Sequence, residues 1–235
     1  LHTGTIPSKT FREAVLTFGR GGRRASDMRR RASDSNGNGF KAVTAGQLFE
    51  RVGNIVQREE QVQDAQLGRN DVDVIVGTAK FKDPHELLIT SSQGERTASA
   101  KNIMIAVGTR PATPPDTQLD GERIITSDEI FNLDELPHSM VVIGCGVVGI
   151  EYASMFALLG VEVTVVDGRG TPLEFLDREI VDELVHQMRA INVVFRLGET
   201  VERVETRDAA RGRVVVSLES GKRLVADVAL VCAGR

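Results

Sequence analysis

The sequence contains few aromatic residues and few cysteines. Phe, Tyr and Trp together make up 4% of the 235 residues, and Trp is absent. The two cysteines, Cys145 and Cys232, form neither a CxxC pair nor a metal-binding spacing, so the sequence predicts no disulfide framework and no metal site. Both lie in apolar or glycine-rich surroundings, which predicts buried thiols. Cysteines that are few and without a framework suit a reducing compartment, so we predict a cytoplasmic protein.

Long apolar runs and a strong excess of one charge are also missing. No stretch approaches the roughly 18 apolar residues of a membrane-spanning helix, so we expect no membrane segment. The formal net charge of −4 argues against a general nucleic-acid binder. The histidines are scattered without metal or triad spacing. The chain begins with Leu1 rather than Met, and its first residues do not have the pattern of a signal peptide, so we expect it to be the middle part of a longer protein.

The first half of the chain predicts two helices and a small set of strands. One helix is expected over 7–18, and a long polar helix from a capping box of Thr44 and Gln47 to Gly68. Residues 19–39 are rich in arginine and glycine and indicate a loop. A solvated loop is the preferred interpretation of its basic run, and a phosphate or nucleic-acid contact stays open. Strands are expected over 72–81, 86–90 and 102–107.

The second half, after prolines near residue 111, alternates strands with helices. Helices are expected over 147–159 and 177–191. Buried strands are expected over 139–143, 161–166, 192–197 and 228–232. Segments 201–205, 213–218 and 223–225 indicate a small antiparallel meander. Continuous Val and Ile runs predict a parallel sheet covered on both faces, so the fold class is α/β and Rossmann-like.

A glycine-rich turn joins the strand over 139–143 to the next helix. It reads Gly144-Cys145-Gly146-Val147-Val148-Gly149. In this context the first glycine permits a tight turn, the second lets the backbone approach a pyrophosphate, and the third lets helix and strand pack closely. The helix start, including Val147 and Val148, would present N–H groups to phosphates. The turn therefore predicts a dinucleotide site.

Two charged residues follow the next strand. Asp167 ends that strand, where an acidic side chain accepts hydrogen bonds from an adenosine ribose and favours NAD. Arg169 lies two residues on and is suited to a 2′-phosphate, which would favour NADP. A solvated surface role for Arg169 is equally open.

Residues Gly4-Thr5-Ile6-Pro7-Ser8-Lys9 resemble the redox-active turn of the pyridine nucleotide-disulphide oxidoreductases. The second cysteine of that turn falls on Thr5, and a hydroxyl can neither close a disulfide nor carry a thiolate at neutral pH. This version of the turn is similar to that of the soluble, flavin-dependent pyridine nucleotide transhydrogenases. The resemblance implies FAD, NAD and NADP as cofactors, with Thr5 beside the flavin.

Further motifs carry the resemblance along the whole chain. They are Gly77-Thr78-Ala79, which resembles the turn at the FAD adenine, Ala106-Val107-Gly108-Thr109-Arg110-Pro111, which resembles the hand-over between domains, and Cys232-Ala233-Gly234-Arg235, which resembles the second Gly-Arg motif. The resemblance implies that Ala79, Gly108, Thr109 and Gly234 contact cofactor. It also implies that residues 1–111 are the later part of an FAD domain and 112–235 an NAD(P) domain. The FAD fingerprint and a C-terminal domain that forms a homodimer are then expected outside this chain.

Lys9 and Glu151 are the expected catalytic residues. In relatives, the lysine after Ile-Pro-Ser meets a glutamate of the nucleotide-binding helix, and Glu151 lies at the matching place. A buried ammonium needs a buried carboxylate, so we predict a buried ion pair beside the flavin.

The resemblance implies NAD(P)+ transhydrogenation, the transfer of hydride from NADPH to NAD+ through FAD. Three alternatives stay open. A dihydrolipoamide dehydrogenase-like enzyme needs a second thiol in the redox turn, which Thr5 does not provide. Another flavin reductase would pass electrons to oxygen, a quinone or a metal ion. A nucleotide sensor without activity would bind NADH but would not bleach the flavin.

Overall fold

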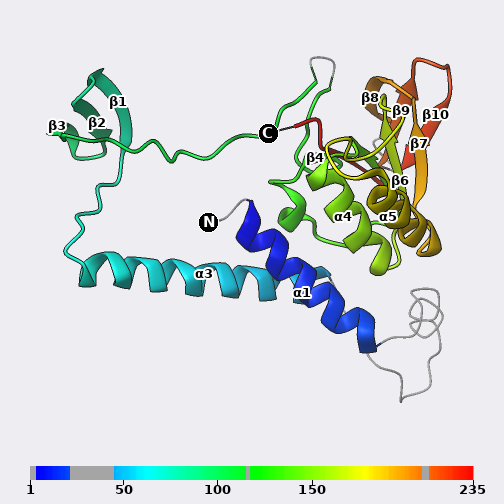
Figure 1. The fold of residues 1–235 in the computed structure, drawn as a ribbon, viewed down its shortest axis with the longest axis horizontal. Helices are drawn as coiled ribbons and strands as arrows, with labels where there is room; N and C mark the ends of the chain where they lie inside the picture. The colour runs from blue at the N-terminus through cyan, green and yellow to red at the C-terminus, as the bar shows by residue number, and fades with distance from the viewer. Residues whose placement is uncertain (1–3, 22–44, 115–116, 208–211, 235) are drawn as a thin grey trace. The chain divides into compact units, whose positions relative to one another are not determined.

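A five-stranded parallel sheet is the middle layer of the larger of two compact units in this computed structural model (Figure 1), which describes residues 4–21, 45–114, 117–207 and 212–234. The strand order is β4-β11-β5-β6-β7, and every neighbouring pair is parallel. The strands are β4 (Ile124–Thr126), β5 (Ser139–Ile143), β6 (Glu162–Asp167), β7 (Val194–Leu197) and β11 (Val228–Val231). The predicted α/β class with a parallel sheet is confirmed.

Alternate residues of the strands enter two separate cores. In β5, Met140 and Val142 belong to a core shared with the helices, whereas Val141 and Ile143 belong to a second core. The second core includes Val214 and other residues of an antiparallel meander. Successive side chains of a strand point to opposite faces, so the sheet is buried between helices on one face and the meander on the other.

The predicted meander is present, and so are the predicted helices of the second half. The meander strands are β8 (Val201–Arg207), β9 (Arg213–Leu218) and β10 (Arg223–Ala226), in the order β10-β9-β8. The helices are α4 (Val147–Leu158) and α5 (Arg178–Ala190), with a short 3-10 turn η1 (Ile130–Asn132) before β5. Asp177 caps α5 by accepting a hydrogen bond from the Glu179 amide.

The helices of the first half join the helix-side core. Helix α1 (Thr5–Gly21) contacts α4, and α3 (Ala45–Arg69) contributes Leu48, Val52 and Val56. Helix α1 begins at Thr5 rather than at Pro7 as expected. The arginine-rich segment from residue 22 and the capping residue Thr44 lie outside the described residues.

Five of the few aromatic side chains gather where α1 meets α4. Phe11 is fully buried, and its ring lies 5.7–6.5 Å, centroid to centroid, from four others. These are Phe49, Phe131, Tyr152 and Phe156. Aromatic rings at such spacings attract one another and stabilise a core beyond the effect of burying their surface. The scarce aromatic residues are therefore concentrated at the contact that positions α1.

By its internal contacts the chain forms two compact units. One comprises Leu1–Gln57 with Arg110–Arg235, and the other Arg58–Thr109. The smaller unit contains the antiparallel sheet β1 (Thr78–Asp83), β2 (Glu86–Ser91) and β3 (Gly94–Ser99). This division by contacts does not test the predicted FAD and NAD(P) domains, which stay a prediction.

One strand prediction for the smaller unit was wrong, one strand begins later than predicted, and one strand was missed. The strand predicted over 72–81 is present only from Thr78, as part of β1. Residues 72–77 and 102–107 are not strands, because no described strand pairs with them and a strand without a neighbour leaves its backbone groups to water. The apolar side chains of Met104, Ile105 and Val107 remain exposed. Strand β3 was not expected because its sequence is polar, and pairing with β2 holds it instead.

Replacing Phe11 with Ala tests the aromatic contact. We expect Phe11→Ala to lower the free energy of unfolding by about 3–5 kcal/mol, because a fully buried ring leaves a cavity among four others. Urea unfolding measures the change. Phe175→Ala is the matched control, since Phe175 is 71% exposed, and it should change stability by no more than about 0.5 kcal/mol. Equal losses in the two variants would contradict the assignment.

Candidate dinucleotide site

The turn between β5 and α4 depends on two glycines for its backbone path. Gly144 has φ of 108°, and a Cβ there would lie 2.3 Å from the Cys232 carbonyl oxygen. A Cβ on Gly149 would lie 2.0 Å from the Gly144 carbonyl oxygen. Both distances are far below van der Waals contact, so neither position accepts a side chain without a backbone shift. These two glycines let strand β11, the turn and helix α4 meet.

Gly146 differs from these two glycines. It is the residue before the first turn of α4, and a Cβ there would meet nothing within 4 Å. Val147, the first residue of the helix, is 57% exposed. The first N–H groups of a helix have no partner within the helix and carry a partial positive charge. Open space beside these donors fits a pyrophosphate, and the folded chain itself does not require glycine at 146.

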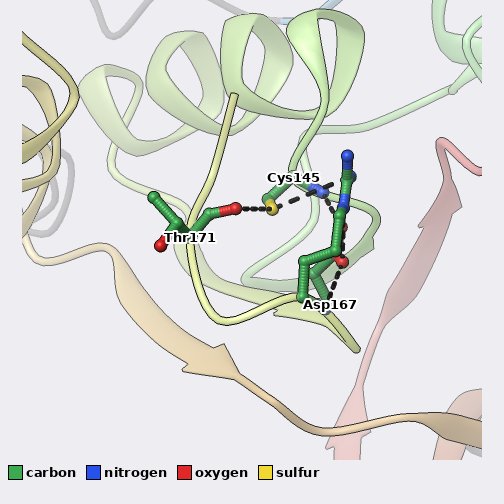
Figure 2. A network of polar contacts seen from close by, with 4 residues as sticks. Cys145, Asp167 and Thr171 are labelled. Atoms are coloured by element: carbon green, nitrogen blue, oxygen red, sulfur yellow. Dashed lines mark hydrogen bonds and ion pairs between the residues drawn. The ribbon is translucent and has the colours of Figure 1, made fainter. Parts of the chain in front are cut away.

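Asp167, at the end of β6, is hydrogen-bonded both to this turn and to Arg169. Its carboxylate accepts bonds from the Cys145 backbone N–H (2.7 Å) and from the Arg169 backbone N–H (2.8 Å). The Arg169 guanidinium donates two more, from Nε (2.9 Å) and Nη2 (2.7 Å). Figure 2 shows Cys145 between Asp167 and Thr171, whose carbonyl oxygen is 3.9 Å from the Cys145 sulfur. The predicted acid and base thus lie together at the turn.

Hydrogen bonds and burial determine which groups of this network carry a charge. Burial alone would raise the pKa of Asp167, but the bonds from Arg169 and the Cys145 amide outweigh burial and hold that pKa well below its usual range. The bond to Asp167 raises the pKa of Arg169. Burial raises the pKa of the Cys145 thiol to about 12. Asp167 and Arg169 are therefore a charged pair, and Cys145 is a neutral thiol.

A cavity of about 220 Å³ lies where α1 meets the start of α4. Its lining includes five residues that the sequence singled out: Thr5, Lys9, Val147, Val148 and Glu151. The Lys9 ammonium lies 2.6 Å from Glu151 Oε1, although the two residues are 142 positions apart in the chain. The first turns of two helices thus line one cavity with an ammonium and a carboxylate.

The ion pair is less buried than predicted. The Lys9 side chain is 61% exposed and the Glu151 side chain 20%. Lys9 lies near the start of α1, and more than half of its side chain is exposed to solvent. An exposed pair contributes only about 0.2–1 kcal/mol to stability. Removal of one partner of a buried pair is far more costly, and that larger cost is not expected here.

The other predicted cofactor residues lie elsewhere. Gly234 has φ of 131°, and its carbonyl oxygen accepts a hydrogen bond from the Ala112 N–H (2.9 Å). In the smaller unit, Ala79 pairs with Ile89 between β1 and β2. Gly108 has φ of 69°, and Thr109 is the last residue of that unit. Their contact with FAD stays a prediction.

Sequence reasoning missed five residues of the site. Four of them line the cavity, namely Gly4, Ser8, Ser127 and Tyr152, and the amide of the fifth, Cys145, binds Asp167. Ser127 follows β4 at the carboxyl end of a parallel strand, which is where ligands bind in such sheets. That signal was hidden because β4 has only three residues.

Two classes of feature are not found among the described residues. No three His, Cys, Asp or Glu side chains gather as they would around a metal ion. No helix in the described ranges combines the length and the apolar character that crossing a membrane requires.

Substitutions of two glycines separate the fold from the ligand site. We expect Gly149→Ala to lower stability by about 1–3 kcal/mol or more, because its methyl group meets the Gly144 carbonyl. Gly146→Val should stay folded and lose nucleotide affinity, because its side chain fills the open space before α4. Thermal unfolding and calorimetric titration with ADP-ribose measure the two effects. A folded Gly146→Val variant with unchanged affinity would count against the site.

Known proteins match this sequence along its whole length. The family model described as pyridine nucleotide-disulphide oxidoreductase matches residues 2–235. The chain is 43% identical over 238 residues to the soluble pyridine nucleotide transhydrogenase of Mycobacterium tuberculosis (strain ATCC 25177 / H37Ra), covering 100% of this chain and 49% of that protein. It is 36% identical to the transhydrogenase of Colwellia psychrerythraea, covering 100% of this chain and 48% of the relative. The chain thus spans about half the length of the curated relatives it matches.

Solved structures agree with the sequence matches. The crystal structure of LpdA from Mycobacterium tuberculosis superposes with a TM-score of 0.81 at 26% identity, over 99% of this chain and 49% of that one. The HOCl-induced flavoprotein disulfide reductase RclA from Escherichia coli, as its Cu(II) complex, gives a TM-score of 0.77 at 26% identity, over 99% and 47%. The chain belongs to the pyridine nucleotide-disulphide oxidoreductase family.

Proposed function

We propose that this chain is the central part of a flavin-dependent NAD(P)+ transhydrogenase, which transfers hydride between NADPH and NAD+ through FAD. The observation that carries the proposal is Thr5 in the cavity beside Lys9 and Glu151. A hydroxyl replaces the second thiol of the redox turn, while the ion pair and the nucleotide-binding helix are retained. The relatives named above as transhydrogenases support the same function.

The residues of the turn fit NAD(P). The open side of Gly146 and the first-turn amides at Val147 and Val148 would hold the pyrophosphate. Asp167 would bind the adenosine ribose of NAD, and Arg169 the 2′-phosphate of NADP. The pair lies at the carboxyl end of β6, next to the glycine turn. An acid and a base at this place are compatible with an enzyme that uses both nucleotides.

The donors that line the cavity fit a flavin. They are the Lys9 ammonium, the hydroxyls of Thr5 and Ser127, and the start of α4. We assign FAD contacts to Thr5, Ala79, Gly108, Thr109 and Gly234, with residues 1–111 in an FAD domain and 112–235 in an NAD(P) domain. When bound, FAD supplies the group that accepts and returns hydride.

Lys9 and Glu151 position charge at this place. The carboxylate holds the ammonium at 2.6 Å, so the positive charge is fixed at the cavity before substrate arrives. A fixed charge that faces developing negative charge lowers a barrier because nothing has to reorganise during the reaction. Thr5 and Ser127 line the same cavity and have short side chains, which would leave room for a ligand beside the ammonium. The chain would thus contribute the positions of the reacting groups and the electrostatics of hydride transfer.

Thiol chemistry is disfavoured by both cysteines of the chain. Burial raises the pKa of Cys145 and of Cys232 to about 12, so neither is a thiolate near neutral pH. Neither of them lines the cavity. A dihydrolipoamide dehydrogenase-like reaction is therefore less well supported than transhydrogenation. We also propose a cytoplasmic homodimer, whose dimerisation domain lies outside this chain.

Thiol alkylation tests the function. We expect the full-length protein to keep NADPH-to-NAD+ hydride transfer after treatment with N-ethylmaleimide, because no step uses a thiolate. The rate is measured before and after, with mass spectrometry to count modified cysteines and absorbance to confirm retained flavin. Complete loss of turnover with the flavin still bound would contradict the proposal.

Replacing Lys9 tests its role separately from stability. Lys9→Met should cost no more than about 1 kcal/mol of stability, since its side chain is mostly exposed. The same change should slow bleaching of the flavin by NADPH roughly 100-fold. Lys82→Met is the matched control, because Lys82 forms a comparable exposed pair with Glu86 at 2.9 Å. A bleaching rate for Lys9→Met equal to that of the control would refute the role.

A further inference from the structure

Every acceptor position of the Asp167 carboxylate is occupied. Oδ1 accepts from the backbone N–H of Arg169 and from its Nε. Oδ2 accepts from the Cys145 N–H and from Nη2 of Arg169. A carboxylate offers about four lone-pair sites, and all four are used. A ribose hydroxyl that approaches Asp167 must therefore displace one of these donors.

The guanidinium is the donor that can leave. The Cys145 amide is part of the turn whose path Gly144 and Gly149 constrain, and the Arg169 amide is part of the main chain that follows Asp167. The Arg169 side chain is 45% exposed, whereas that of Asp167 is only 9% exposed. Rotation of the arginine side chain frees two acceptor positions and leaves the two backbone bonds in place.

We propose that Arg169 competes with the adenosine ribose of NAD(H) for Asp167, and that the 2′-phosphate of NADP(H) relieves this competition by taking the guanidinium as its own partner. The proposal rests on the proposed function, since it requires a dinucleotide at this turn. Arg169 then acts on both nucleotides, with opposite sign. It weakens NAD(H), which offers the displaced guanidinium no anion at the ribose, and it strengthens NADP(H).

The charges at the turn give the physical basis for the opposite signs. Asp167 and Arg169 neutralise each other while they are paired. NAD(H) separates the pair and replaces a charged donor with neutral hydroxyls. NADP(H) separates the same pair and gives the arginine a phosphate, a partner for charge-assisted bonds. The backbone bonds from Cys145 and Arg169 keep the carboxylate in one place in both complexes.

ADP-ribose and 2′-phospho-ADP-ribose test the proposal by calorimetric titration of the full-length protein. Neither probe carries nicotinamide, so the readout does not depend on hydride transfer. For Arg169→Ala we expect ADP-ribose to bind up to about fivefold more tightly, as the loss of a competing ion pair with a half-exposed arginine allows. Affinity for 2′-phospho-ADP-ribose should fall about 10- to 100-fold.

Two further variants serve as controls. Arg169→Lys keeps the charge and loses the two-pronged hold on Asp167, so ADP-ribose should again bind more tightly while part of the 2′-phosphate affinity remains. Arg178→Ala removes an exposed arginine of α5 that pairs with Asp182 at 3.8 Å. It should leave both affinities unchanged, which separates the effect of Arg169 from that of net charge.

The outcomes distinguish this proposal from the proposed function. Unchanged or weaker ADP-ribose binding by Arg169→Ala would overturn the competition, even with 2′-phosphate affinity lost. A wild-type protein that binds neither probe would overturn the nucleotide site itself, and with it the proposed function. Tighter ADP-ribose binding together with weaker 2′-phospho-ADP-ribose binding would support both.

Discussion

The contact between α1 and α4 is the interaction on which the site depends. Phe11 of α1 is buried among the aromatic rings of its neighbours, including Phe156 of α4. This packing sets the start of α1 beside the start of α4, so Thr5 and Lys9 share a cavity with Glu151. The apolar contact supplies the stability, because the exposed ion pair contributes little. The ion pair in turn fixes where the positive charge lies.

The glycine turn applies a second constraint, which joins the candidate nucleotide site to the sheet. Gly144 and Gly149 are needed because the backbones of β11, the turn and α4 approach too closely for side chains. Gly146 is free of that demand and leaves open space before the helix. Asp167 bonds to the same turn through the Cys145 amide, so the residue that we propose binds the adenosine ribose is held by the loop that would hold the pyrophosphate.

Much of this could be predicted from the sequence, and the failures have physical causes. Strands β5 and β6 and helix α4 were predictable because buried strands are continuous apolar runs and the glycine spacing marks the turn between them. The partnership of Lys9 with Glu151 came from a family resemblance, since no local pattern links residues so far apart. Its exposure was not predictable, because burial depends on tertiary packing. Strand β4 is too short to show an apolar pattern. The spacing of Asp167 and Arg169 in the sequence does not reveal that the arginine side chain donates hydrogen bonds to the carboxylate.

We propose that hydride passes between nucleotides at a flavin with no dithiol in the relay. An anaerobic titration of the full-length flavoprotein with NADPH, followed at the flavin absorbance, counts the reducing equivalents that the site accepts. With Thr5 in the redox turn, bleaching should be complete at about one equivalent of NADPH per flavin, because the flavin is the only two-electron acceptor. A requirement for about two equivalents would reveal a disulfide that is reduced as well, and would contradict the account.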